Sequence, residues 1–301
     1  MKKPYYFKKL FQIVLLAIFI VLLSTGTAQL EGDNFLWEIS GEEGEFYLMG
    51  SLHFMPQGSY PLSDEIYNAL NNSDLLAVEL DLRELDQQLI QQYVQENGLF
   101  HDETRLEDVL DEDTYEKIIE LTGDFGLAES QVNLFKPWYA SQVISDIIFQ
   151  EIGFESAEGV DLHMIQQAEE QDIKLFELET FEEQMDMIST MDIDLQVAVL
   201  KDTLADLDYQ ADTLVELVDK WHEGEVEPIY EFLFANREEN PDIEEYYQKV
   251  FDERDSNMKE GILELLPDYD KPFVVVGSGH IINNEGLLYL FENAGFETEQ
   301  L

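Results

Sequence analysis

Two matching stretches near opposite ends of the chain decide the expected fold: FYLMGSLH at residues 46–53 and PFVVVGSGH at residues 272–280. In each, a short apolar run is followed by the pattern Gly-Ser-x-His. Such a run is typical of a strand that is buried on both faces of a sheet, and glycine allows a tight turn at its end. Ligands of open α/β sheets bind beyond the carboxyl ends of the strands. We therefore expect His53 and His280 to meet in a crevice at this edge.

The rest of the chain alternates between short apolar runs and amphipathic segments. Further strands are predicted at residues 34–39, 75–80 and 173–178, the last as a buried strand. Helices are predicted at residues 61–71, 159–171, 181–207, 212–236, 243–266 and 285–294, with three more segments inside 84–151. No linker rich in proline, glycine or serine divides residues 29–301, so we predict a single domain there. It is expected to be an α/β fold with a central mixed or parallel sheet, its active crevice at the strand carboxyl ends covered by helical insertions at residues 84–160 and 181–266.

Residues 1–28 have the composition of a secretory signal peptide. A basic start with four lysines precedes the apolar residues 10–23, and small residues follow up to Ala28, after which we predict cleavage. The alternative is an uncleaved membrane anchor formed by residues 10–23. The protein is therefore expected to be secreted or otherwise outside the cytoplasm, with membrane contact only through this segment. No cysteine follows the apolar run, which excludes a lipid-modified lipoprotein.

The charge of the chain is strongly negative. It has 66 acidic and 16 basic residues, for a formal net charge of −50, and the acids are spread over every helical segment. Such a surface repels nucleic acid and anionic membranes, which excludes both as partners. We interpret the acidity as a halophilic adaptation, because salt screens the self-repulsion. The lack of cysteine excludes thiolate ligands and thiol nucleophiles, so a metal site would need histidine and carboxylate.

A carboxylate accompanies the two histidines. Glu79 follows the apolar run at residues 75–78 and is expected at the same edge of the sheet. Two imidazoles and a carboxylate can bind a divalent transition metal ion with open positions. Without a metal ion, the same three groups could act as a general base with its orienting partners. In the plainest alternative, the histidines only satisfy hydrogen bonds in their loops.

Other residues could support this site. Asp161 and His163 open a predicted helix, where Asp161 could cap the free amides or reach the crevice. Glu179 follows the strand predicted at residues 173–178. Glu253 and Arg254 form either a surface ion pair or, through the fork of the guanidinium group, a clamp for a carboxylate.

These segments, in this order, resemble the TraB/GumN family, which includes the Tiki-type proteins proposed as metalloproteases. The resemblance covers most of residues 29–301. It runs through residues 46–53, 60–62, 78–79, 136–138, 159–163, 178–180, 252–255 and 276–280. Members of the family are described as metal-dependent peptidases, as proteins of pheromone shutdown and as polysaccharide-cluster proteins. One departure is Asp255, where the family often has asparagine.

The resemblance implies that the paired Gly-x-x-His motifs and the strand-end glutamate are the active residues. We expect an exported metal-dependent hydrolase, in the first instance a peptidase with a peptide or protein substrate and manganese, cobalt or zinc as cofactor. The expected metal ligands are His53, Glu79, His280 and Asp161, and the expected catalytic residues are Glu79, Glu253, Arg254 and His163. The alternative is a non-catalytic protein of the same fold that binds a peptide, a pheromone or a haem-like ligand, because the chain has no His-Glu-x-x-His motif.

Overall fold

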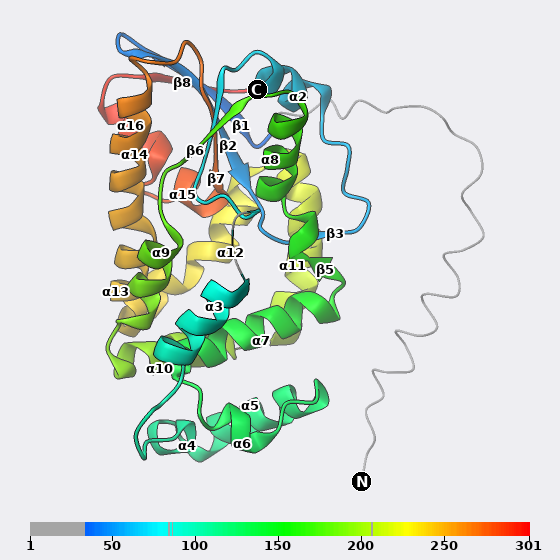
Figure 1. Cartoon of the computed structure of the whole chain (residues 1–301), viewed down its shortest axis with the longest axis vertical. Coiled ribbons are helices and arrows are strands. Elements are labelled where there is room, and N and C mark those ends of the chain that lie inside the picture. Colours follow the sequence, from blue (N-terminus) through cyan, green and yellow to red (C-terminus); the bar gives the residue numbers. More distant parts are fainter. Residues whose placement is uncertain (1–33, 84, 86, 206) are drawn as a thin grey trace, which may run out of the picture. The chain divides into compact units, whose positions relative to one another are not determined.

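Four adjacent parallel strands belong to a six-stranded sheet in the computed structural model, which describes residues 34–83, 85, 87–205 and 207–301 (Figure 1). The strand order is β6-β4-β7-β2-β1-β8. The bounds are β1 Leu36–Gly41, β2 Gly44–Ser51, β4 Leu75–Val78, β6 Lys174–Glu177, β7 Phe273–Gly277 and β8 Glu297–Gln300. Strands β6, β4, β7 and β2 run parallel, whereas β1 is antiparallel to both of its neighbours. The predicted α/β class is confirmed, and the carboxyl ends of β2, β4 and β7 share one edge.

Burial explains why the central strands could be predicted from the sequence. Every residue of β4 and β7 is buried, as expected for parallel strands covered on both faces. The prediction for residues 173–178 was correct about the strand but wrong about its burial. Strand β6 lies at the sheet edge, and its Phe176 is 40% exposed. The strands that were not predicted are the polar β8 and the pair β3 (Met55–Pro56) and β5 (Phe154–Glu155), which at two residues each are too short to form an apolar run.

Helices cover both faces of the sheet. Those of the first half are α2 Asp64–Asn71, α3 Gln87–Tyr93, α4 Leu106–Val109, α5 Glu112–Asp124, α6 Glu129–Val132, α7 Pro137–Glu151 and α8 Val160–Glu170. Those of the second half are α9 Phe181–Ser189, α10 Ile193–Thr203, α11 Leu207–His222, α12 Val226–Glu239, α13 Glu244–Tyr247, α14 Glu253–Leu265, α15 Ser278–Ile282 and α16 Leu287–Asn293. Helices α2 and α8 lie on one side of the sheet and α14 and α16 on the other (Figure 1).

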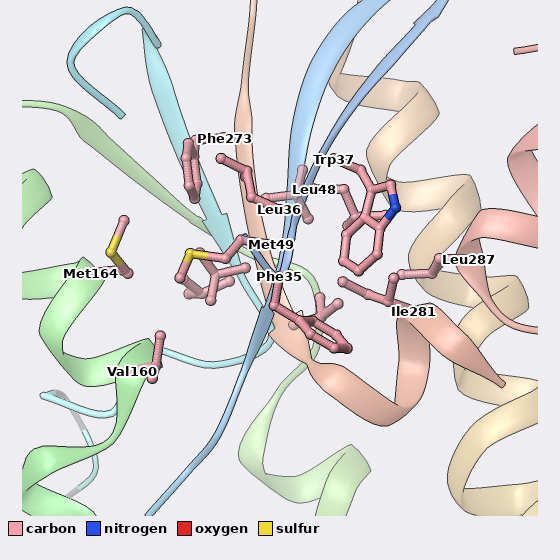
Figure 2. Packing of buried hydrophobic residues seen from close by; sticks show 14 of the residues in the cluster. Phe35, Leu36, Trp37, Leu48, Met49, Val160, Met164, Phe273, Ile281 and Leu287 are labelled. Carbon is pink, nitrogen blue, oxygen red and sulfur yellow. The ribbon is translucent and has the colours of Figure 1, made fainter. Parts of the chain in front are cut away.

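The two faces of β2 pack against different helices. Figure 2 shows Met49 on the side of α8, with Val160 and Met164. Leu48 lies on the opposite side, toward Ile281 of α15. This follows from the alternation of side chains along a strand, and it means that Ser51 shares the α8 face with Met49.

The predicted long helices are shorter in the structure. Residues 181–207 contain α9, α10 and the first residue of α11, and residues 212–236 are divided between α11 and α12. Residues 243–266 include α13, a π-helical turn (Gln248–Asp252) and α14. The second Gly-Ser-x-His segment is also not a loop, because Gly277 ends β7 and is at the same time the N-cap of α15. His280 therefore projects from a short helix. π-Helical turns often occur at functional sites, and this one directly precedes α14, whose second residue is Arg254.

A second hydrophobic cluster lies within the helical region. It is built by α4, α5, α6, α7 and α10 and includes Leu106, Ile118, Val132, Ile144 and Leu200. The main cluster joins the sheet to the remaining helices, and the indole N–H of Trp221 on α11 donates to the carbonyl oxygen of Gly50 over 2.9 Å. Residues Gly32–Leu301 form one compact unit.

The predicted signal peptide or anchor lies outside the described residues. Among those that the structure describes, no helix is both long enough and apolar enough to cross a membrane.

Candidate functional site

His53, Glu79 and His280 surround one point beside Gly277 at the carboxyl end of β7. A methyl group added to the Cα of Gly277 would lie 3.3 Å from Glu79 Oε1 and 3.4 Å from His53 Nε2. It would also lie 3.6 Å from Cδ2 of the His280 ring. The structure thus brings together the three residues that the sequence placed at strand ends, and glycine at position 277 leaves the space between them open.

Asp161 orients His53. Its Oδ2 lies 3.0 Å from His53 Nδ1, because the N–H of Val160 donates to the carbonyl oxygen of Leu52 and joins α8 to the loop after β2. Gly159 allows this approach, since a Cβ at that position would lie 2.5 Å from the carbonyl oxygen of His53. Asp161 therefore binds the ring nitrogen that faces away from Gly277, a position suited to orienting a metal ligand rather than to ligation.

The charge of His53 is set by its neighbours. Its side chain is 54% exposed to the crevice, although protein surrounds it on the other sides. The resulting desolvation would lower its pKa, but the carboxylate of Asp161, with a contribution from Glu79, raises the pKa of His53 to about 9. In the metal-free protein, these carboxylates therefore favour the protonated form of His53.

Asp255 holds His280 in the same manner. His280 Nδ1 lies 2.5 Å from Asp255 Oδ1, and the amide of Asn283 donates to Asp255 Oδ2 over 3.3 Å. His280 Nε2 faces the other way and lies 4.0 Å from Glu79 Oε1. Both histidines thus have a carboxylate at Nδ1 and direct the other side of the ring toward Gly277 and Glu79.

Glu79 is held by a backbone amide and by an arginine. Its Oε1 accepts from the N–H of Gly277 over 2.5 Å, and its Oε2 binds Arg254 Nη2 over 2.5 Å. Arg254 also binds both oxygens of Glu179: its Nε donates to Oε1 over 2.9 Å and its Nη2 donates to Oε2 over 2.6 Å. Burial would raise the pKa of Glu79, but His280, Arg254 and His53 outweigh this effect and lower it to about 2.

A cavity of about 230 Å³ opens beside His53, Glu79 and Asp161, whereas His280 and Arg254 do not line it. His53, Glu79, Asp161, Ser51 and Gln184 supply polar atoms to its walls. The remaining wall is largely apolar, with Phe54, Val78, Leu80, Leu82 and Val275. Reactive side chains in a small, mostly apolar cavity are what a binding or active site requires.

Two predicted residues lie elsewhere. His163 stacks on Tyr60, with ring centroids 3.8 Å apart, and its Nε2 hydrogen-bonds with the hydroxyl of Tyr67 over 2.9 Å. Glu253 is exposed and lines a separate surface hollow with Asp252. The structure therefore gives neither residue a contact with the crevice.

Sequence reasoning missed Asp255 as a site residue. A signal was present, because Asp255 starts the buried stripe of α14 that continues with Met258, Ile262 and Leu265. A carboxylate on an apolar helical stripe needs a buried partner. Here that partner is His280.

The donor chemistry of the site suits a divalent transition metal ion. Two imidazole nitrogens, each oriented through Nδ1 by a carboxylate, and one carboxylate oxygen form a possible set with open positions. Among the described residues, no three such groups are already arranged as a complete ligand set. Binding would therefore require side-chain movements of His53, His280 or Glu79.

The fold and the site define a mixed α/β protein in which two strand-end histidines, each paired with a carboxylate, meet a buried glutamate. The chain belongs to the TraB/PrgY/gumN family, whose family model matches residues 35–300. It is 25% identical over 199 residues to the uncharacterized protein YbaP of Escherichia coli (strain K12), covering 64% of this chain and 72% of that protein. The uncharacterized protein YbaP of Shigella flexneri matches with the same identity and coverage. No solved structure gives a significant match.

Proposed function

We propose that the chain is a hydrolase that uses a divalent transition metal ion and acts on peptide bonds. The observation that carries this proposal is the pair of imidazoles around Gly277, each with Nδ1 on a carboxylate and Nε2 near Glu79. A histidine that donates through one ring nitrogen to a carboxylate offers its other nitrogen as a ligand. His53, His280 and Glu79 would hold the ion.

The bound ion would supply Lewis-acid activation of water and of the substrate carbonyl group. Glu79, with its pKa lowered to about 2, is a weak proton acceptor at neutral pH and is better suited to bind a cation. Arg254 keeps Glu79 and Glu179 in place through charge-assisted hydrogen bonds. Because Asp161 and Glu79 favour the protonated form of His53, metal binding would displace a proton and would strengthen as the pH rises.

Metal content tests the proposal directly. The protein lacking residues 1–28 would be incubated with manganese, cobalt or zinc, dialysed and analysed by elemental mass spectrometry, alongside His53→Ala and His280→Ala. His101→Ala is the matched control, because His101 is exposed and bonds only to the carbonyl oxygen of Glu96 among the described residues. We expect close to one ion per chain in the wild type and the control, and little in the two site variants.

Hydrolysis of unfolded casein and of fluorogenic peptides should follow the metal content. Activity that survives complete chelation, or in His280→Ala, would contradict a metal-dependent mechanism.

A second cavity supports the alternative of a ligand-binding protein. It has a volume of about 910 Å³ and lies among α7, α10, α11 and α12, where Ile148, Leu214, Leu217, Phe232 and Phe251 line it. Cavities of this size hold whole small molecules. Mass spectrometry of the native protein would reveal a retained ligand, and tight retention without turnover would favour this alternative over the hydrolase.

A further inference from the structure

The serines of the two Gly-Ser-x-His segments differ in their hydrogen bonding. Ser278 Oγ donates to the carbonyl oxygen of Ser51 over 3.0 Å and so ties the two segments together. Ser51 Oγ has no partner, although Ser51 is only 2% exposed. Among the described residues, the only other buried side-chain atom in this situation is Asp161 Oδ1. A buried polar group without a partner is costly, and its presence needs an explanation.

The register of the sheet directs Ser51 to the reactive groups. Ser51 is paired with Gly277 between the parallel strands β2 and β7. Side chains of paired residues project from the same face of a sheet. On that face at Gly277 lie Glu79 Oε1 and His53 Nε2. Ser51 also lines the 230 Å³ cavity, as does Asp161.

We infer that Ser51 is a substrate-binding residue whose hydroxyl group donates a hydrogen bond to a carbonyl oxygen of the bound peptide. This inference rests on the proposed function. Asp161 Oδ1 offers a matching acceptor for an N–H group, and a peptide group carries both a carbonyl oxygen and an N–H. The apolar wall formed by residues such as Val78 and Val275 faces the adjacent side chain of the substrate. The cavity is smaller than those that hold drug-sized ligands, which are roughly 300–1,000 Å³. It therefore takes about one apolar residue.

The two serines provide a matched pair of variants. The probe is N-acetyl-leucine N-methylamide, one apolar residue between two peptide groups, and its affinity is measured by NMR titration of the purified protein. We expect Ser51→Ala to weaken binding about five- to tenfold, the effect of one hydrogen bond, without lowering the thermal unfolding temperature. Ser278→Ala should do the reverse, with a lower unfolding temperature and an affinity within about twofold of the wild type.

Three results would overturn the inference: equal affinity of Ser51→Ala and the wild type, a clear loss of stability in Ser51→Ala, or no binding of the probe to the wild type. The binding measurement does not need turnover. Weaker binding by Ser51→Ala in a protein that hydrolyses nothing would refute the proposed function alone. Hydrolysis by the wild type with unchanged affinity in Ser51→Ala would refute only the role of Ser51.

Discussion

Asp255 Oδ1 lies 2.5 Å from His280 Nδ1, and Asp255 has no exposed surface. The contact joins the third residue after the π-helical turn to the histidine that follows β7. Burial raises the pKa of Asp255, an effect that the hydrogen bond and charge of His280 partly offset. Asp255 accepts from His280 with one oxygen and from Asn283 with the other, so both of its oxygens are in use.

Asp255→Asn should therefore disturb the site even though it conserves shape. An amide has one acceptor oxygen, so it cannot accept from both His280 and Asn283, and one donor is left facing another donor. We expect a loss of about 1–3 kcal/mol in the free energy of unfolding and about a 10- to 100-fold loss of metal affinity or hydrolysis. Urea denaturation and activity assays would measure the two effects.

Glu253→Gln is the control for that substitution, because Glu253 lies on the same helix but is exposed. It should leave the stability within about 0.5 kcal/mol of the wild type. If Asp255→Asn were as stable and as active as this control, the contact would have no role in orienting His280.

Arg254→Gln should be strongly destabilising at neutral pH. Arg254 is the cation between the carboxylates of Glu79 and Glu179, and its loss removes the ion pair that each of them makes with it. Removing one partner of a buried ion pair costs about 3–5 kcal/mol in the free energy of unfolding. Urea denaturation at pH 7 would measure this loss, and Arg254→Lys should recover only part of it because lysine lacks the planar fork.

The destabilisation by Arg254→Gln should shrink as the pH falls. The folded-state pKa of Glu79 is lowered from 4.5 to about 2, so its stabilising contribution is fully present above pH 4.5 and is lost as the pH falls toward 2. Protonation of Glu79 also relieves the variant of an uncompensated charge. The difference in unfolding free energy between wild type and variant should therefore be largest at pH 7. A constant or growing difference on acidification would show that Arg254 acts through packing rather than charge.

Gly277→Ala should impair metal binding and hydrolysis much more than it lowers the stability. The backbone at Gly277 has φ of −53°, which alanine adopts readily, but the new methyl group would fill the point between Glu79, His53 and His280. We expect at least about a tenfold loss of metal affinity and hydrolysis with a loss of stability of about 1 kcal/mol, because the contacts are tight rather than severe. Calorimetric metal titration and thermal unfolding would test this.

Gly123→Ala is the matched control, since a Cβ there meets nothing within 4 Å. Gly123 lies in α5, where alanine should raise the stability by up to about 1 kcal/mol and leave activity unchanged. If Gly277→Ala kept wild-type activity, His53, Glu79 and His280 would not act together at the point beside Gly277.

The sequence predicted the residues whose placement depends on buried parallel strands. His53, Glu79 and His280 follow β2, β4 and β7, and a short apolar run, followed by glycine in the case of β2 and β7, indicates such a strand directly. Asp255 and Ser51 were not predicted as site residues, because their roles depend on helix rotation and sheet register rather than on local sequence. The acid-rich composition also hid the buried carboxylates, since exposed acids are common in this chain. The packing of α14, and not the local sequence, decides which of the neighbours Glu253, Arg254 and Asp255 face the site.

His163→Ala tests a residue that the sequence predicted to be part of the site. In the structure, His163 lies beside the site. His163 stacks on Tyr60 and hydrogen-bonds with Tyr67, and burial lowers its pKa, so it is neutral in the folded protein at pH 7. Loss of the stack and of the hydrogen bond should lower the free energy of unfolding by about 1–3 kcal/mol. At a temperature where both proteins are folded, kcat should change less than about twofold, because His163 does not line the cavity. A large fall in kcat without loss of stability would instead assign His163 a direct role in the reaction, since packing against Tyr60 cannot account for that combination.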